Sequence, residues 1–183
     1  MEWTLPGTVL QIPEKNAEKI EQVFSSLFLG GGIVLSQVSG ITGLEPHTVQ
    51  NWVKRGFLPP PEKKRYSLGQ LCRIININML KGILPMERIC GLLTYINGHL
   101  DDASDDIIDD SQLYFMFVEL AMQARSLTEA ETRQQVLRNI LLRYEEPVPG
   151  ARERVENVLR IMLTGYLAAS LQQQTETMIK EIM

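Results

Sequence analysis

Five polar residues between positions 47 and 54 have side chains suited to reading a base-pair edge or holding a phosphate. Gln50 and Asn51 carry amides, which can donate to and accept from one adenine at the same time. Lys54 supplies a cation for phosphate oxygens, and His47 and Thr48 precede it on the same short stretch. If this stretch is helical, its spacing turns all five side chains outward near the start and along one flank.

The surrounding sequence has the layout of a helix-turn-helix. Ser36 is expected to cap a short first helix, and Gly43-Leu44 to form the turn. Glu45-Pro46 starts the second helix because proline fits a first turn, and Gly56 ends it. Apolar side chains fall where the two helices must pack, at Val38, Ile41, Val49 and Val53. The second helix can then lie in a major groove of DNA.

A basic stretch follows the second helix. Pro59-Pro60-Pro61 cannot be helical, so Glu62 to Tyr66 is expected to be extended, as a small β-hairpin rich in lysine and arginine. Trp52 is expected to pack mainly in the core beneath this hairpin, with its edge near a phosphate. The residues predicted to contact DNA are Ser36, His47, Thr48, Gln50, Asn51, Trp52, Lys54, Arg55, Lys63, Lys64, Arg65 and Tyr66.

Charge is distributed unevenly along the 183 residues, whose formal net charge is −4. The segment from Leu35 to Gly91 holds eight basic and three acidic residues, so it carries +5 and the remainder −9. A basic head on an acidic body is typical of DNA-binding regulators. The alternative is that these charges gather by chance on solvated faces.

The elements that would position these residues are almost all helices. A helix opening at Pro13 is ended by Gly30-Gly31-Gly32, and further helices are predicted from hydrophobic spacing and capping residues. They cover residues 67–81, 85–97, 111–126, 128–144 and 149–181. An aspartate-rich run, His99 to Asp110, lacks the order of a calcium loop and is interpreted as helix-capping residues within a solvated linker.

That run also supplies the main predicted domain boundary. Residues 1–32 are predicted to form an N-terminal helix and glycine linker, residues 33–98 a DNA-binding domain, and residues 99–183 a helical dimerisation or sensor domain. The predicted fold class is therefore mainly α, with a winged helix-turn-helix head followed by an all-helical C-terminal domain.

Two family resemblances rest on this head. From Leu35 to Leu93 the chain resembles the winged helix-turn-helix of the MerR family, through Arg55-Gly56-Phe57-Leu58-Pro59, Lys64-Arg65-Tyr66-Ser67 and Gly82 to Ile89. From Phe28 to Phe117 it more closely resembles the bacterial domain of unknown function 1836 family. The strings Gln50-Asn51-Trp52-Val53-Lys54-Arg55-Gly56 and Ile77-Asn78-Met79-Leu80-Lys81 carry that likeness.

The MerR resemblance implies a dimer on palindromic DNA, with recognition helices in successive major grooves and wings on the backbone. The chain departs from that family in three respects. His47 and Gln50 stand where arginines are usual, the wing from Glu62 to Tyr66 is short, and the metal-sensing cysteines after a long dimer helix are absent.

The sequence offers no arrangement of residues suited to catalysis, so we expect a protein that is not an enzyme and that needs no cofactor or metal. Cys72 and Cys90 lie on apolar faces, as small buried residues do, and the two histidines, His47 and His99, join no cluster. The first residues lack the positive charge of a signal peptide. The longest apolar run, 161–171, is far below the ~20 residues of a membrane span, and a cytoplasmic protein is expected.

The predicted partner is double-stranded DNA, bound by a homodimer that acts as a sequence-specific transcriptional regulator. The last helix carries a broad apolar stripe for the dimer, unless it packs on its own domain; the stripe comprises Val155, Val158, Leu159, Met162, Tyr166, Leu167, Leu171, Met178 and Ile182. The C-terminal part could also hold an unidentified small molecule among its Met and Leu side chains. An alternative function stays open, in which the head is a protein-interaction adaptor without DNA binding.

Overall fold

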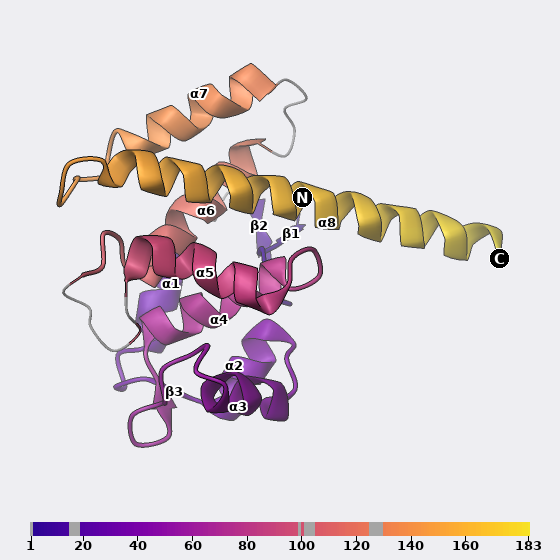
Figure 1. Cartoon of the computed structure of the whole chain (residues 1–183). Helices are drawn as coiled ribbons and strands as arrows, with labels where there is room; N and C mark the ends of the chain where they lie inside the picture. The colour runs from indigo at the N-terminus through magenta and orange to yellow at the C-terminus, as the bar shows by residue number, and fades with distance from the viewer. Residues whose placement is uncertain (1, 15–18, 99, 101–104, 125–129) are drawn as a thin grey trace.

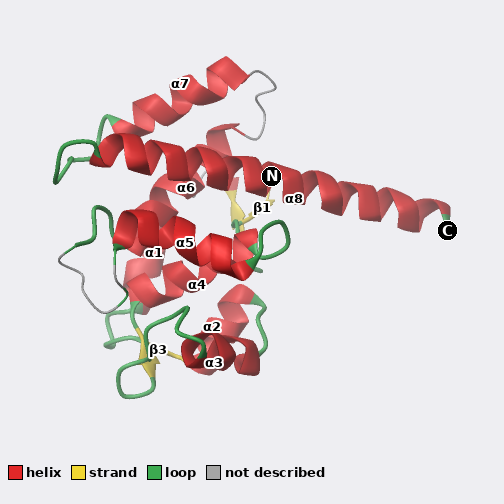
Figure 2. Cartoon of the chain, viewed as in Figure 1, coloured by secondary structure: helices red, strands yellow, loops and turns green. Residues whose placement is uncertain are grey.

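The computed structural model describes residues 2–14, 19–98, 100, 105–124 and 130–183, and it is mainly helical, which confirms the predicted class (Figures 1 and 2). The helices are α1 (Ile20–Leu27), α2 (Leu35–Thr42), α3 (Pro46–Lys54), α4 (Leu68–Leu80), α5 (Met86–Asn97), α6 (Asp110–Ala124), α7 (Ala130–Leu141) and α8 (Ala151–Ile182). The strands are β1 (Glu2–Thr4), β2 (Gln11–Pro13), β3 (Ile33–Val34) and β4 (Arg65–Tyr66).

Helix α4 is the centre of the molecule. Ser67 caps it, because its hydroxyl accepts from the Gln70 N–H at 3.2 Å while the Gln70 side chain accepts from the Ser67 N–H at 2.8 Å. Almost every side chain from Leu71 to Leu80 is buried, the polar residues Arg73 and Asn76 included. The helix packs against α2, α5, α6 and α8, and the predicted helix over 67–81 is confirmed.

The N-terminal hairpin, β1 and β2, was absent from the sequence prediction. Trp3 opposes Ile12 in its antiparallel register, and its indole Nε1 donates to the Tyr166 hydroxyl on α8 at 3.4 Å. The Tyr114 hydroxyl on α6 donates to the Pro6 carbonyl at 3.1 Å. Three-residue strands carry little periodicity, and this pair is stabilised by distant helices. Downstream, the helix predicted from Pro13 begins only at Ile20 among the described residues.

The aspartate-rich run ends differently from its prediction. Its residues 99 and 101–104 lie outside the described ranges. Helix α6 begins at Asp110 rather than Ser111, and the Asp109 carboxylate accepts from the Ser111 N–H at 2.7 Å. Capping is thus confirmed for Asp109, but a solvated linker is wrong for Asp110, whose side chain is only 13% exposed. Its burial follows from an ion pair described below.

Helix α8 spans two environments. Its first half is buried against α4, α5, α6 and α7, with Val155, Val158, Leu159 and Met162 in the core. From Leu171 to Met183 the residues are exposed, and this half extends beyond the rest of the molecule (Figure 1). Packing on its own domain therefore explains the first part of the predicted stripe and leaves the second part uncovered. No helix in the described ranges is long and apolar enough to cross a membrane.

Candidate nucleic-acid interface

Helices α2 and α3 pack against each other across a three-residue turn. Val38 and Val49 are fully buried between them, and Ile41 and Val53 are half-buried. Gly43 starts the turn with φ of +70°, a left-handed conformation that glycine adopts without strain, and its N–H donates to the Ser39 carbonyl at 2.8 Å. The helix bounds follow the predicted turn residues closely.

The start of α2 corrects one prediction. Ser36 lies in the first turn rather than at the N-cap position, which Val34 occupies. The Gln37 side chain accepts from the Val34 N–H at 3.0 Å and satisfies that end of the helix. Ser36 is exposed, so its hydroxyl remains on the surface beside α3.

An asparagine on α4 fixes the turn from behind. The Asn78 Nδ2 donates to the Thr42 carbonyl at 2.9 Å and to the Gly7 carbonyl at 2.9 Å. One amide thereby joins the end of α2, the N-terminal loop and the central helix. Sequence reasoning missed this role, although an asparagine in an otherwise apolar helix was the available signal.

The outer face of α3 carries the predicted base-reading residues together. His47, Gln50, Asn51 and Lys54 are all exposed and follow the i, i+3, i+4, i+7 spacing of one helix face. Thr48 is half-buried at the edge of this face. Helix α3 contains no acidic residue, so no carboxylate of its own would repel an anion there.

Two of the predicted contact residues are in the core. Trp52 is 5% exposed and Tyr66 is 3% exposed, and burial raises the pKa of the Tyr66 hydroxyl. Their side chains support the surface from beneath and do not form part of it, which corrects their assignment as contacts. This agrees with the expectation that Trp52 packs in the core.

The basic stretch forms a tight turn beside α3. The Arg65 N–H donates to the Glu62 carbonyl at 2.8 Å, and Lys63 and Lys64 have φ of 48° and 65°. Positive φ at both central residues is the signature of the type I′ turn. Strand β4 then pairs antiparallel with β3 rather than forming a longer hairpin with the residues before the turn. Both lysines are exposed, and neither forms an ion pair in the described structure.

The glycine triplet contributes to this turn, beyond the linker role predicted for it. Gly32 has φ of +103°, and a Cβ at that position would lie 2.9 Å from the Tyr66 carbonyl oxygen. Its own carbonyl accepts from the Arg65 Nη1 at 2.8 Å. The Arg65 guanidinium is exposed but partly committed to this bond.

Two arginines join the region after α3 to later helices. The Arg55 Nη2 lies 3.3 Å from the Glu87 Oε1 on α5, and its guanidinium stacks 4.5 Å from the Phe57 ring centroid. Arg73 on α4 donates through Nε to the Phe57 carbonyl and through Nη1 to the Asp110 Oδ2, both at 3.2 Å. Burial raises the pKa of the Asp110 carboxyl to about 6, although Arg73 acts in the opposite direction.

A groove of about 610 Å³ separates α3 from the turn. It brings together three predicted contact residues, Ser36, Gln50 and Lys64, over a floor of apolar side chains. That floor consists of Val34, Leu35, Val53, Pro61 and Tyr66. His47, Asn51 and Lys54 do not line this groove, so polar and apolar features lie side by side on this surface.

Other chemistry is limited in the described part of the chain. Cys72 is buried and Cys90 half-buried, neither forms a disulfide, and burial raises the pKa of both thiols. No group of three or more His, Cys, Asp or Glu side chains there could hold a metal ion. The exposed face of α3 with its neighbouring turn is the arrangement best suited to an anionic polymer.

Comparison with known proteins matches the part of the chain that carries this surface to a family. The family model of the domain of unknown function DUF1836 matches residues 14–117, which include α1 to α5 and the first half of α6. The uncharacterized protein YkrK of Bacillus subtilis (strain 168) is 24% identical over 163 residues, covering 82% of this chain and 70% of YkrK. No solved structure matches the chain.

Proposed function

This chain belongs to the domain of unknown function 1836 family, and we propose that it is a transcriptional regulator whose head binds double-stranded DNA. The observation that carries the proposal is the outer face of α3. It presents His47, Gln50, Asn51 and Lys54 without an acidic residue on the helix. Those side-chain types can pair with base edges and phosphates when a helix enters a major groove.

The order of elements supports a winged helix-turn-helix of the MerR type. Helix α2, a turn with Gly43 in the left-handed conformation and helix α3 come first, and then the turn at Lys63 and Lys64 leading into β4. In such heads the second helix reads bases and the following turn, or wing, contacts the backbone. Here the wing is one tight turn, so we propose contacts by Lys63 and Lys64 to one stretch of phosphates.

Charge supports the same function. Between Leu35 and Gly91 the net charge is +5, whereas the rest of the chain carries −9. In Figure 1, α2 and α3 lie at the opposite side of the molecule from α7 and α8. An acidic body held away from the head leaves the basic surface free to approach a duplex.

We further propose that the protein acts as a homodimer through the exposed half of α8. Its exposed residues Leu171, Thr175, Met178 and Ile182 follow one another at intervals of four, three and four, the spacing of a coiled-coil seam. A dimer would place two heads on one DNA site, which a small single head needs for specific recognition.

Sedimentation equilibrium of the full chain tests the dimer. Leu171→Lys with Met178→Lys should convert it to a monomer because both charges fall in the seam. Gln173→Lys lies off the seam and should leave the dimer intact. A wild-type monomer at tens of micromolar, or equal effects of seam and control variants, would contradict this part of the proposal.

Selection from a random duplex library, at low and at physiological salt, tests DNA binding. We expect enrichment of a palindrome whose half-sites lie about one helical turn apart. Asn51→Ala should cost ~1–3 kcal/mol of binding free energy on that sequence alone. Lys63→Ala and Lys64→Ala should weaken binding to every sequence and each lower the salt slope by about one.

Lys180→Ala on the exposed end of α8 is the matched control for Lys63 and Lys64. It should change neither the affinity for duplex DNA nor its dependence on salt. Retention of no duplex even at low salt would sink the proposal. So would unchanged binding after Asn51→Ala, Lys63→Ala and Lys64→Ala together.

The groove beside α3 favours a second candidate function, a protein-interaction adaptor. Its floor of Val34, Leu35, Val53, Pro61 and Tyr66 would accept apolar side chains of a peptide, which DNA lacks apart from thymine methyl groups. Val34→Lys discriminates the two, because Val34 lines the groove and is exposed, whereas Val53 packs α3 against α2. It should abolish peptide binding in this groove, while on DNA an added cation should preserve or raise affinity.

A further inference from the structure

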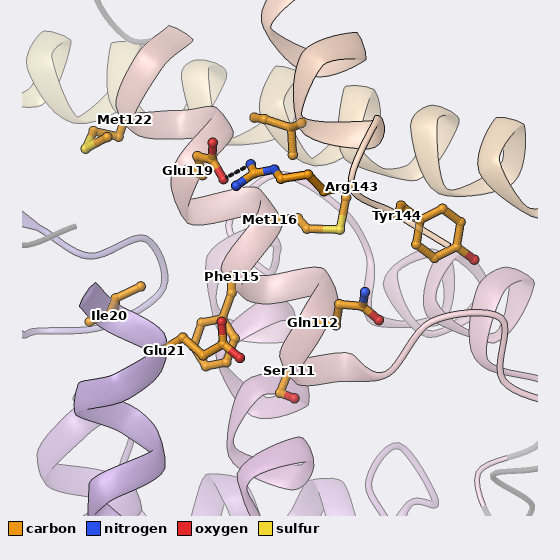
Figure 3. Close-up of a pocket in the computed structure, with 11 residues that line it drawn as sticks. Ile20, Glu21, Ser111, Gln112, Phe115, Met116, Glu119, Met122, Arg143 and Tyr144 are labelled. Atoms are coloured by element: carbon orange, nitrogen blue, oxygen red, sulfur yellow. Dashed lines mark hydrogen bonds and ion pairs between the residues drawn. The ribbon is translucent and has the colours of Figure 1, made fainter. Parts of the chain in front are cut away.

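A second cavity, of about 720 Å³, lies between α1, α6 and the end of α7 with the residues that follow it (Figure 3). Small-molecule sites in proteins are typically ~300–1,000 Å³. None of the residues that line it also lines the groove beside α3. Its apolar walls come from Ile20, Phe115, Met116, Met122, Ile140 and Tyr144.

The charged groups of this cavity are unbalanced. Arg143 is the sole cation among the lining residues that the structure describes, and its guanidinium is paired with the Glu119 carboxylate (Figure 3). Glu21 lines the same cavity from α1 and forms no hydrogen bond or ion pair in the described structure. One carboxylate therefore remains uncompensated in a cavity whose walls combine polar and apolar side chains.

The chemistry of the walls restricts the ligand further. A carboxylate or phosphate would be repelled by Glu21 and would have to displace Glu119 from Arg143. A cation would be attracted by Glu21, and Phe115 and Tyr144 supply aromatic surface for an apolar group. Met116 and Met122 are flexible, polarizable side chains that adapt to apolar groups of varied shape.

We propose that this cavity binds a hydrophobic organic cation, an ammonium group carried on an apolar body. Glu21 faces the charge, and the methionines and aromatic rings cover the apolar part. The site is independent of what the head binds, so it stands or falls separately from the proposed DNA-binding function. The sequence left open an unidentified small-molecule ligand. This proposal assigns that ligand to one cavity and gives it a positive charge.

Isothermal titration calorimetry of the full chain with n-decylamine and with decanoate tests the charge preference, because the two share a chain length and differ in sign. Both are used at neutral pH and below the concentrations at which they form micelles. We expect saturable binding of one decylammonium per chain, with decanoate weaker by about tenfold or more. Glu21→Gln should weaken decylammonium binding about two- to fivefold, since an exposed carboxylate is partly screened.

Glu119→Gln gives the sharpest result because it releases Arg143. Decylammonium should then bind less tightly and decanoate more tightly, so that the preference narrows or reverses. Met116→Trp should fill the cavity and weaken both ligands. If thermal unfolding shows that Met116→Trp does not fold, Glu21→Gln and Glu119→Gln still test the charge preference of the cavity.

Glu176→Gln, an exposed carboxylate on the far half of α8, is the control and should leave both affinities unchanged. Three results would overturn the proposal. The first is no saturable binding of decylammonium, and the second is decanoate binding as tightly as decylammonium. The third is an equal loss of binding in Glu176→Gln and Glu21→Gln, which would indicate attraction to the acidic surface in general.

Discussion

Arg55 at the end of α3 and Arg73 on α4 have the same chemistry in opposite surroundings. Arg55 and its partner Glu87 have side chains 51% and 71% exposed, whereas those of Arg73 and Asp110 are 4% and 13% exposed. The N–O distances are almost equal, at 3.3 and 3.2 Å. Distance therefore does not distinguish them. Exposure distinguishes them, because solvent screens the first pair. In the second pair, removal of one partner would leave the other charge buried and unpaired, at a high cost in free energy.

The contrast assigns the pairs different roles. Arg73 joins three segments, since it also holds the Phe57 carbonyl just beyond α3. Its replacement would disturb the head and α6 together. Arg55 can exchange Glu87 for another anion at little cost, so it stays available to a phosphate although it is paired in the structure.

The largest expected effect is on the free energy of unfolding. Asp110→Ala should lower it by about 3–5 kcal/mol because it leaves the Arg73 guanidinium buried without its carboxylate. Glu87→Ala should lower it by no more than ~0.5 kcal/mol, since its pair is exposed. Urea unfolding followed by circular dichroism measures both, and equal losses in the two variants would remove the distinction.

The second effect is a dependence of stability on pH. The folded pKa of Asp110, about 6, lies above its usual 3.8 because of burial. Its contribution to stability is therefore fully present below about pH 4 and is lost as pH rises through about 6, by up to ~3 kcal/mol. The difference in unfolding free energy between wild type and Asp110→Asn should show this fall.

Asp110→Asn removes the titrating group while keeping its size. A difference that stays flat between pH 4 and 7 would mean that Arg73 offsets burial and leaves the pKa of Asp110 at its usual value. A difference that rises with pH would mean that the carboxyl titrates below its usual range in the folded protein.

A third, smaller effect concerns DNA and rests on the proposed function. Glu87→Gln releases Arg55, so affinity for a duplex at low salt should rise about two- to fivefold and the salt slope steepen by about one. Fluorescence anisotropy of a labelled duplex at several salt concentrations measures both. Reduced affinity would show that Glu87 holds Arg55 in its binding position rather than competing for it.

The smallest effect is the coupling within the exposed pair. A double-mutant cycle of Arg55→Ala and Glu87→Ala should give about 0.5 kcal/mol or less, and 1 M salt should abolish it. The same cycle on Arg73 and Asp110 should give several-fold more and should respond little to salt. Similar coupling energies in both cycles would contradict the role given to exposure.

The sequence predicted those parts of the head that depend on local signals. Ser67 with Gln70, Pro46 and Gly56 mark helix ends through their own backbone preferences, and each ends or starts a helix where expected. The outward position of Asn51 follows from helical spacing alone. Such features are determined within a few residues along the chain.

The parts of the fold and of the site that the sequence did not predict depend on contacts between residues far apart in the chain. Asn78 bonds to Gly7 and to Thr42, and Arg55 pairs with a residue 32 positions away, so no local pattern indicates either. The hairpin of β1 and β2 needs α6 and α8 to bury it. Arg73 did leave a signal, because an arginine inside an apolar helix requires a buried acceptor.

The turn at Lys63 and Lys64 combines positive charge with an unfavourable backbone conformation. Left-handed conformations at residues other than glycine cost of order 1 kcal/mol each, and Asn-Gly is the pair that such a turn favours. Exchanging the two lysines for Asn-Gly would stabilise the fold while removing two positive charges. The two lysines therefore place two positive charges at the tip of the turn at the expense of folding stability.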